Sequence, residues 1–285
     1  MPEIVSAIIT THNRAHLLKR AVESVLRQTY PHLECIVVDD NSTDNTSQVC
    51  TQFSNIRYIH IAANESKGGN YARNIGIQAA KGRYVAFLDD DDYWLPEKIE
   101  KQIEVINKSK AEVVYCGRRN EILENNEVKY SDLMPSNDFE GDLSRKIFTA
   151  IPTTTSALLI KKDVLERIGL FDEKLKFWQE YDLMIRLAQV AEFDFVAEPL
   201  LIYRIDKSDP QRLTNKYYPW KDAVKYVHEK HRLLLSHLTL AEKLEFHRVV
   251  ASDEFLRINN STNRLLRLKA KIKYLCTIAA CKIFK

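Results

Sequence analysis

The chain has 285 residues, of which 45% are hydrophobic and 28% are charged, a composition typical of a globular protein with one large domain and an appendage. Its formal net charge of +3 favours no class of partner. The five cysteines form no C-x-x-C pair, which argues against a disulfide framework or a zinc site and favours a reducing compartment. The first residues lead into an apolar run without a basic leader or a cleavage site, so we expect a cytoplasmic protein.

The first 116 residues alternate between strand and helix patterns. Apolar, β-rich runs predict strands over residues 4–10, 35–38, 58–61, 84–88 and 113–116. Helical spacing, capping residues and a first-turn proline predict helices over residues 17–26 and 70–80, after 42–46 and from 96 onward. This alternation is typical of an α/β domain with a mostly parallel sheet. Ligands bind beyond the carboxyl ends of such strands, where we expect the aspartates of residues 39–40 and 89–92 to converge.

The second half of the chain follows a different pattern. Residues 121–142 are polar and turn-rich, which predicts a hairpin or a mobile loop. We then expect a strand over residues 156–160, helices over 163–168 and 180–190, and a strand over 200–204. From about Trp220 the pattern is helical throughout. We therefore divide the chain into an α/β domain over residues 1–215 and a helical extension over residues 216–285.

Residues 89–92 are four consecutive aspartates at the end of a predicted strand. Like charges this close raise one another's pKa and destabilise the site unless a cation is present. A divalent metal removes that cost, and Mg²⁺ prefers one or two carboxylates completed by water and substrate phosphates. The other interpretation is a solvated acidic turn before a helix, where aspartate suits the helix dipole. The apolar and aromatic residues on both sides of the run favour the metal.

Five segments, in this order along the chain, resemble the motifs of family 2 inverting glycosyltransferases. They are residues 8–14 (IITTHNR), 37–44 (VVDDNSTD), 72–76 (ARNIG), 87–92 (FLDDDD) and 179–182 (QEYD). The resemblance covers about residues 3–215. It implies a GT-A fold with a mostly parallel central sheet, followed here by a C-terminal helical extension.

The resemblance assigns roles to the aspartates. Asp91 would hold Mn²⁺ or Mg²⁺, and Asp89 would contact the ribose of a nucleotide-sugar. Asp90 or Asp92 takes these roles if the register slips by one residue. Asp40 resembles the aspartate that accepts the N3–H of uracil in the family, with a plain turn residue as the alternative.

Four further residues are implied in nucleotide-sugar binding. Thr11 and Asn13 end the first strand and would line the nucleotide pocket. Arg14 would reach a phosphate or lie in the first turn of a helix. Arg73 would pair either with the diphosphate or with the aspartates, since guanidinium groups bind both.

An inverting transfer needs a base that takes the proton of the acceptor hydroxyl as it attacks. The family carries this base on an acidic pair before a helix, and the aligned pair here is Gln179 and Glu180. We predict Glu180 as the catalytic base, with Asp182 as the second candidate. The other interpretation of Glu180 is an acid that stabilises the helix dipole. Trp178 would either stack on a sugar or pack in the core.

The implied activity is inverting transfer of a sugar from a nucleotide-diphosphate donor, UDP-linked by resemblance, to a glycan or lipid-linked acceptor in cell-surface polysaccharide synthesis. A nucleotidyltransferase is one alternative, but the first strand is not followed by the glycine- and basic-rich triphosphate loop that such an enzyme needs. A non-catalytic nucleotide-sugar binding protein is the other. Turnover by a Glu180→Gln variant distinguishes an enzyme, in which the rate of transfer should fall, from a binding protein.

The C-terminus is basic. No acidic residue follows Glu254, and eight basic residues do: Arg257, Arg264, Arg267, Lys269, Lys271, Lys273, Lys282 and Lys285. Leucines and isoleucines lie among them, which predicts a basic amphipathic helix on the inner face of the membrane or a helix packed on the catalytic domain. Aromatic residues are sparse there, so we expect no nucleic-acid partner.

Overall fold

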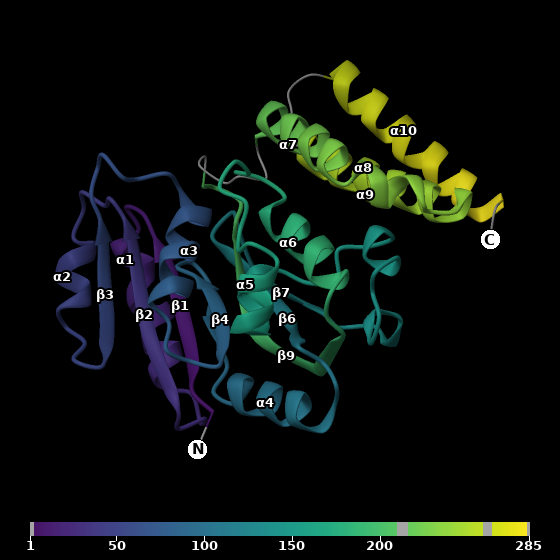
Figure 1. Cartoon of the computed structure of the whole chain (residues 1–285). Coiled ribbons are helices and arrows are strands. Elements are labelled where there is room, and N and C mark those ends of the chain that lie inside the picture. Colours follow the sequence, from purple (N-terminus) through teal and green to yellow (C-terminus); the bar gives the residue numbers. More distant parts are fainter. Residues whose placement is uncertain (1–2, 210–215, 259–263, 284–285) are drawn as a thin grey trace.

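The computed structural model describes residues 3–209, 216–258 and 264–283. Its strands form one sheet in the order β3-β2-β1-β4-β8-β6-β9-β5, with β7 paired to β6 (Figure 1). The strands are β1 (Val5–Thr11), β2 (Leu33–Asp40), β3 (Ile56–Ile61), β4 (Tyr84–Asp89), β5 (Tyr93–Trp94), β6 (Val113–Glu124), β7 (Glu127–Leu133), β8 (Leu159–Lys161) and β9 (Phe193–Asp206).

The first four strands of the sheet are parallel, as the alternating pattern predicts. The side chains of β1, β2 and β4 are largely buried on both faces, which is why these strands appear in the sequence as continuous apolar runs. The edge strand β3 is only partly buried. The register aligns the ends of the strands: Thr11 is paired with Asp39, and Thr10 with Asp89. The two predicted aspartate clusters therefore lie on either side of β1, at one edge of the sheet.

Helices cover both faces of this sheet. The helices are α1 (Ala15–Leu26), α2 (Thr46–Cys50), α3 (Gly69–Ala79), α4 (Lys98–Lys108), α5 (Lys162–Arg167), α6 (Gln179–Ala188), α7 (Tyr217–Lys230), α8 (Arg232–Ser236), α9 (Leu240–Ile258) and α10 (Arg264–Ile283). Apolar side chains of α1 and α4 pack on one face, and those of α3, α5 and α6 on the other. Gly76 lets α3 lie close to β1, because a Cβ there would be 2.5 Å from Ile8 Cγ2.

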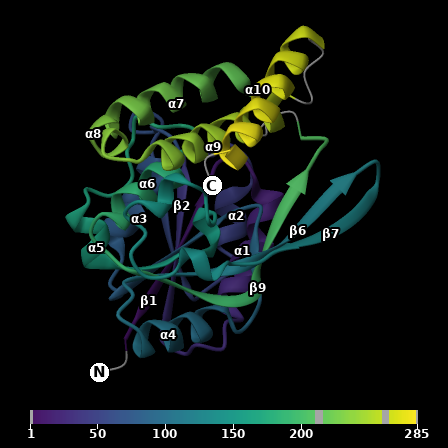
Figure 2. The same ribbon diagram turned by 90° about the vertical axis from the view of Figure 1, so that its right-hand side faces the viewer.

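The second half of the sheet is mixed. The polar segment over residues 121–142 contributes a hairpin of β6 and β7, which extends from the body beside β9 (Figure 2). The predicted strand over residues 156–160 is partly wrong. A 3₁₀ turn, Thr155–Ala157, occupies its start, and β8 begins only at Leu159. The reason is Ser156, whose hydroxyl donates to Asp92 and accepts the N–H of Asp89.

The C-terminal residues are helical, as predicted, and α7, α8 and α9 pack against the α6 side of the molecule (Figure 1). Trp220, Val227 and Phe246 of this region belong to the same hydrophobic cluster as the α3–α6 face of the sheet. The last helix, α10, packs along α9. Within the residues described, none of the helices combines the length and apolar character needed to cross a bilayer.

Candidate active site

A cleft of about 460 Å³ lies at the carboxyl edge of the parallel strands. Its wall comes from the ends of β1, β2 and β4, the start of α3, the loop before α6 and the end of β9. The lining residues are Thr10, Thr11, His12, Arg14, Asp40, Lys67, Gly68, Gly69, Asn70, Ala72, Arg73, Asp89, Asp90, Asp91, Glu173, Leu175, Lys176, Gln179, Tyr203 and Arg204. Seven of the predicted site residues are among them: Thr11, Arg14, Asp40, Arg73, Asp89, Asp90 and Asp91.

The four consecutive aspartates alternate in exposure. The side chains of Asp89 and Asp91 are 31% and 33% exposed, whereas Asp90 and Asp92 are buried. Asp92 accepts hydrogen bonds from the Ser156 hydroxyl at 2.7 Å and from the backbone N–H of Arg204 at 3.0 Å. Asp92 therefore joins the turn after β4 to β9. Two carboxylates, those of Asp89 and Asp91, remain with substantial exposure.

Two arginines neutralise the run in this structure. Arg14 contacts Asp90 at 3.2 Å and Asp91 at 3.1 Å through Nη1, and the nearly buried Arg73 contacts Asp89 at 2.6 Å. Burial raises the pKa of Asp90 to about 7, against the opposing effect of Arg14. Burial and the carboxylate of Asp89 raise the pKa of Asp91 as well, against the opposing effect of Arg14. Burial and mutual repulsion thus disfavour the ionised form of the run, and a divalent cation bound there would favour it.

The donor set fits a divalent ion that completes its shell with phosphate. Asp91 presents a partly exposed carboxylate that already binds a cationic group. Among the described residues, no group of three or more His, Cys, Asp or Glu side chains is arranged to hold a metal. Mg²⁺ and similar ions need only one or two carboxylates when waters and substrate phosphates supply the rest. Asp91 is the side chain that would hold such an ion.

Asp40 retains an oxygen without a partner. Its Oδ2 accepts the backbone N–H of Gly68 at 2.9 Å, while its buried Oδ1 has no hydrogen-bond partner among the described residues. Gly68 has φ of +98°, a backbone conformation that glycine adopts without strain, and this geometry directs its N–H to Asp40. A buried acceptor without a donor is costly, and a ligand N–H would satisfy it.

Asn13 has a different place from the one predicted. It has a left-handed backbone with φ of +53°, and its side-chain oxygen accepts the backbone N–H of Thr43 at 2.7 Å. Its own N–H donates to the Ser42 hydroxyl at 2.8 Å. Asn13 lines a smaller adjoining cavity of about 280 Å³, which shares Arg14 and Asp91 with the cleft. It thereby ties the loops after β1 and β2 together.

Glu180 lies in the first turn of α6, next to the cleft residue Gln179. Its side chain makes no hydrogen bond or ion pair with another described side chain. Glu180 itself is not among the described residues that line the cleft. Burial raises its pKa, and the charges of Asp253, Arg73 and Asp89 act on it. A raised pKa suits a carboxylate that must take up a proton.

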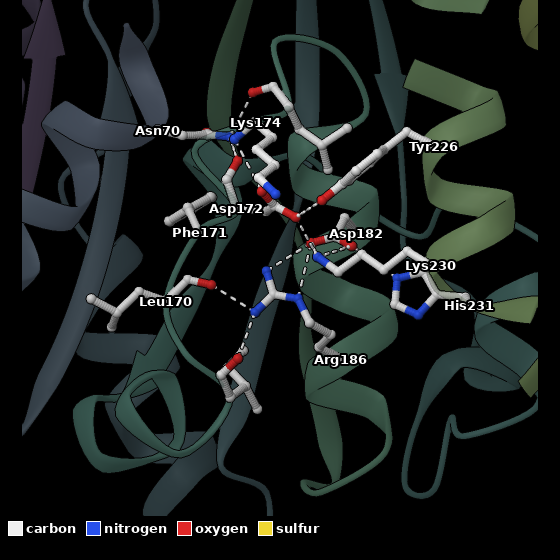
Figure 3. Close-up of polar contacts among 12 residues, drawn as sticks. Asn70, Leu170, Phe171, Asp172, Lys174, Asp182, Arg186, Tyr226, Lys230 and His231 are labelled. Atoms are coloured by element: carbon white, nitrogen blue, oxygen red, sulfur yellow. Dashed lines mark hydrogen bonds and ion pairs between the residues drawn. The ribbon is translucent and has the colours of Figure 1, made fainter. Parts of the chain in front are cut away.

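Asp182 is fully buried and is not among the described residues that line the cleft. Its carboxylate accepts from Arg186 Nε at 2.9 Å, from Lys230 Nζ at 2.8 Å and from His231 Nε2 at 2.8 Å (Figure 3). These partners hold its pKa down at about 2, although burial alone would raise it. A carboxylate with three cationic or donor partners is a poor base, so the structure gives Asp182 a structural role that joins α6 to α7 and α8.

We expect Asp182→Asn to lower the free energy of unfolding at pH 7 by about 1–3 kcal/mol, because it removes the buried counter-ion that Arg186, Lys230 and His231 share. The folded-state pKa lies below the ordinary value of 3.8, so the stabilisation is complete above that value and is lost as pH falls toward 2. Urea unfolding between pH 7 and pH 3 measures both effects. Asp222→Asn, at an exposed position on α7, is the matched control, and equal losses in both variants would contradict this role.

Several cleft residues were missed from the sequence. Asn70 donates through Nδ2 to the carbonyls of Asp172 and Leu175 at 2.8 Å, which fixes the loop before α6 against α3. Asn70 lies two residues before the family-like motif over residues 72–76, and this proximity could have indicated a role at the site. Lys176 and Tyr203 also line the cleft; Lys176 lies in a segment with no motif that could have identified it.

The match to known proteins covers most of this α/β region. The model of "Glycosyl transferase family 2" matches residues 6–169. The chain is 34% identical over 208 residues to the uncharacterized glycosyltransferase RP339 of Rickettsia prowazekii (strain Madrid E), covering 71% of this chain and 64% of the relative. It is 44% identical over 109 residues to the UDP-Glc:alpha-D-GlcNAc-diphosphoundecaprenol beta-1,3-glucosyltransferase WfaP of Escherichia coli, covering 38% of this chain and 43% of that protein. The chain thus spans less than two thirds of the length of these relatives.

Solved structures share the fold. S. aureus TarS 1–349 in complex with UDP-GlcNAc has a TM-score of 0.64 and 19% identity, over 96% of this chain and 79% of that one. The mannosyltransferase PcManGT from Pyrobaculum calidifontis, in complex with GDP-Man and Mn²⁺, has a TM-score of 0.59 and 17% identity, over 98% and 76%. These similarities confirm the predicted GT-A fold. Together with the family match over more than half of the sequence, they lead to one conclusion: the chain belongs to glycosyl transferase family 2.

Proposed function

We propose that this chain is a metal-dependent inverting glycosyltransferase that moves a sugar from a UDP-linked donor to a glycan or lipid-linked acceptor in cell-surface polysaccharide synthesis. One observation carries the proposal: a single cleft combines the Oδ1 of Asp40 with the carboxylates of Asp89 and Asp91, and its lining residue Gln179 directly precedes Glu180 in α6. These are the groups that a nucleobase, a diphosphate with its metal, and an acceptor hydroxyl require. WfaP, by its name, uses UDP-Glc and a lipid-diphosphate-linked GlcNAc, which supports this donor and acceptor class.

The nucleoside end of the donor is assigned to the edge formed by β1 and β2. Asp40 Oδ1 accepts the N3–H of uracil, a donor that cytosine lacks at this position. Thr11 ends β1 between the two aspartate clusters, and Asp89, on the other side of β1, is assigned to the ribose. The hydrogen bonds of Asn13 to Ser42 and Thr43 fix the loops after β1 and β2 relative to each other at this edge.

The diphosphate is assigned to the centre of the cleft. Arg14 and Arg73 are the cationic groups there, and both are paired with the aspartates in this structure. On donor binding they can exchange a carboxylate for a phosphate, since guanidinium binds either group in the same geometry. A divalent ion held by Asp91, when bound, supplies charge neutralisation for the leaving diphosphate. The buried Asp90, which pairs with Arg14, also lines this part of the cleft.

Glu180 is assigned as the base. It removes the proton from the acceptor hydroxyl while the oxygen attacks the anomeric carbon and the nucleoside diphosphate leaves from the opposite face. One C–O bond forms as another breaks, so the anomeric configuration inverts. Asp182 is left out of this assignment because its oxygens are committed to Arg186, Lys230 and His231.

Thermal unfolding with a panel of nucleotides tests the donor class. A ligand raises the apparent stability by mass action, so UDP with Mn²⁺ is expected to raise Tm above the values with CDP, ADP or GDP. Asp40→Ala should remove the preference of UDP over CDP. Equal shifts for UDP and CDP in the unmodified chain would contradict the role of Asp40.

The two alternative functions make different predictions. A nucleotidyltransferase would bind nucleoside triphosphates and release pyrophosphate, and membership of a glycosyl transferase family argues against it. A non-catalytic nucleotide-sugar binding protein would bind UDP-sugars without releasing UDP. A free-UDP assay with UDP-sugars separates both from the proposed reaction.

The C-terminal helix is assigned to an anionic membrane surface. Leu265, Leu268, Ile272 and Leu275 are 61%, 54%, 52% and 53% exposed, and their spacing puts them along one stripe of α10. Basic residues flank the stripe and α10 carries no acid. An apolar stripe with basic edges fits the interface of anionic lipids, where a lipid-linked acceptor would be found.

We expect the chain to sediment with vesicles of equal parts phosphatidylglycerol and phosphatidylcholine, and much less with pure phosphatidylcholine. The double variant Leu268→Asp/Ile272→Asp should weaken this binding by roughly tenfold or more, because it removes two apolar side chains that would insert into the lipid interface. Leu233→Asp on α8, a leucine that is 69% exposed, is the control. Equal binding by all three proteins would refute the membrane assignment.

A further inference from the structure

The residue that introduces α6 has an unusual backbone. Trp178 has φ of +55° and ψ of 22° at the N-terminal end of the helix, two residues before Glu180. Left-handed geometry is a marked exception for a bulky residue and persists only where the surroundings enforce it. The side chain is 2% exposed. Of the two roles considered for Trp178 from the sequence, packing is therefore the one the structure supports, and stacking on a donor sugar is not.

A carboxylate of the C-terminal segment holds the side chain of Trp178. The indole N–H of Trp178 donates to Asp253 Oδ2 at 2.6 Å, and that of Trp220 donates to the same oxygen at 2.7 Å. Arg257 Nε donates to the other oxygen, Oδ1, at 3.1 Å. The Trp178 ring also meets the rings of Tyr181 and Trp220 edge-on, with centroids 5.1 and 6.0 Å apart. Asp253 lies on α9, far beyond the residues that the family model matches.

The same carboxylate acts on Glu180 through its charge. The charged groups that influence Glu180 are Asp253 from α9, Arg73 from α3 and Asp89 from the end of β4. The two carboxylates and burial raise the pKa of Glu180, and Arg73 lowers it. Asp253 is thus linked to the proposed base in two ways: by its hydrogen bond to Trp178, and by the effect of its charge on Glu180.

A second anchor lies on the other side of Glu180. Asp182, two residues further along α6, is held by Lys230 and His231 from the junction of α7 and α8 (Figure 3). Glu180 is therefore flanked, at two residues on each side, by side chains that the C-terminal helices fix.

We propose that Asp253 is a positioning residue for Glu180: by fixing the left-handed Trp178, helix α9 sets the direction in which the first turn of α6 presents Glu180 to the cleft. The inference rests on the proposed function, in which Glu180 is the base. If Asp253 has this role, the C-terminal helical segment contributes to catalysis. Asp253 touches neither donor nor acceptor in this role.

The test is Asp253→Asn in the full chain, assayed for UDP release from a UDP-sugar with an acceptor. Asparagine keeps the shape and one acceptor oxygen but loses the charge. We expect kcat to fall by roughly 10–100-fold, since a misplacement of about 1 Å costs that much, while the donor KM changes by less than about twofold because the cleft is untouched. The acid limb of the kcat–pH profile should move to lower pH, since a like charge facing Glu180 is removed.

Two further variants separate positioning from general damage. Trp178→Phe keeps an aromatic ring but removes the hydrogen bond to Asp253, and it should lower kcat in the same way with no change in the Asp253 charge. Glu254→Gln is the matched control on the same helix. Glu254 accepts from Tyr217 at 2.9 Å and Lys273 at 2.5 Å, so its loss weakens helix packing without a contact to α6, and kcat should stay at the unmodified value.

Each outcome decides the matter. A fall in kcat for Asp253→Asn and Trp178→Phe, with Glu254→Gln unaffected, supports the inference. Unchanged kcat in both of the first two variants overturns it, as does an equal fall in all three. If Asp253→Asn does not fold by circular dichroism, Trp178→Phe alone decides. An unmodified chain that releases UDP from no nucleotide-sugar overturns the proposed function instead, and is distinguished by the absence of any activity to compare.

Discussion

Glu180→Gln is expected to lower kcat for sugar transfer by roughly 10²–10⁴-fold, the range that a positioned general base contributes. The donor KM should change little, because glutamine has the same size and Glu180 makes no hydrogen bond or ion pair with another described side chain that the change would break. In the unmodified chain the rate should fall as the pH drops through the raised pKa of Glu180, since the protonated carboxyl cannot accept a proton. Initial rates of UDP release over a pH series measure both effects.

Glu173→Gln is the matched control for this variant. Glu173 also lines the cleft, it is exposed, and its carboxylate accepts from Asn74 at 3.1 Å, so its charge is close to the site but is assigned no part in proton transfer. Full activity in Glu180→Gln, or an equal loss in Glu173→Gln, would show that the base lies elsewhere. Loss of transfer with UDP binding retained would exclude the non-catalytic alternative.

Asp91→Asn is expected to abolish the dependence of UDP binding on Mn²⁺. In the unmodified chain, Mn²⁺ should strengthen UDP binding by roughly 10²–10³-fold, equivalent to several kcal/mol of charge neutralisation on the diphosphate. In the variant, titration calorimetry should give the same weak affinity with Mn²⁺ and with a chelator. Asparagine also relieves the repulsion within the run, so the variant should fold at least as well as the parent.

Asp92→Asn tests whether the effect belongs to Asp91 or to the acidic run as a whole. Burial and the neighbouring carboxylates raise the pKa of Asp92 well above its ordinary value. The amide can still accept from the Arg204 N–H and donate to the Ser156 hydroxyl, so this variant should keep the metal dependence. Metal-dependent binding that survives in Asp91→Asn and disappears in Asp92→Asn would reverse the assignment and support the slipped register.

The parallel half of the fold could be predicted because its determinants are local. Strands buried on both faces leave continuous apolar runs, and the convergence of Asp40 with Asp89 follows from the shared edge of parallel strands. The turn at Ser156 could not be predicted in this way. The Ser156 hydroxyl is hydrogen-bonded to Asp89 and Asp92, which lie more than sixty residues earlier in the chain. A run of β-forming residues does not indicate such a contact.

The candidate site likewise has features that local sequence predicts and features that depend on long-range contacts. The motifs identified the acidic run, but the burial of Asp92 depends on Ser156 and Arg204, which are far away in the sequence. Asp182 was a reasonable second base from its spacing alone. Its neutralisation depends on Lys230 and His231, some fifty residues away, in a segment that carried no family motif. Long-range ion pairing of this kind leaves no periodic trace in a single sequence.

The most direct test of the account is the linkage formed from an α-linked UDP-sugar. The chain would be incubated with Mn²⁺, a panel of UDP-sugars and a lipid-diphosphate-linked GlcNAc acceptor, and the anomeric proton of the product would be observed by NMR. We predict UDP release with at least one donor and a β-linked product whose formation is lost in Glu180→Gln. An α-linked product, or formation that is unaffected in that variant, would contradict direct displacement assisted by Glu180.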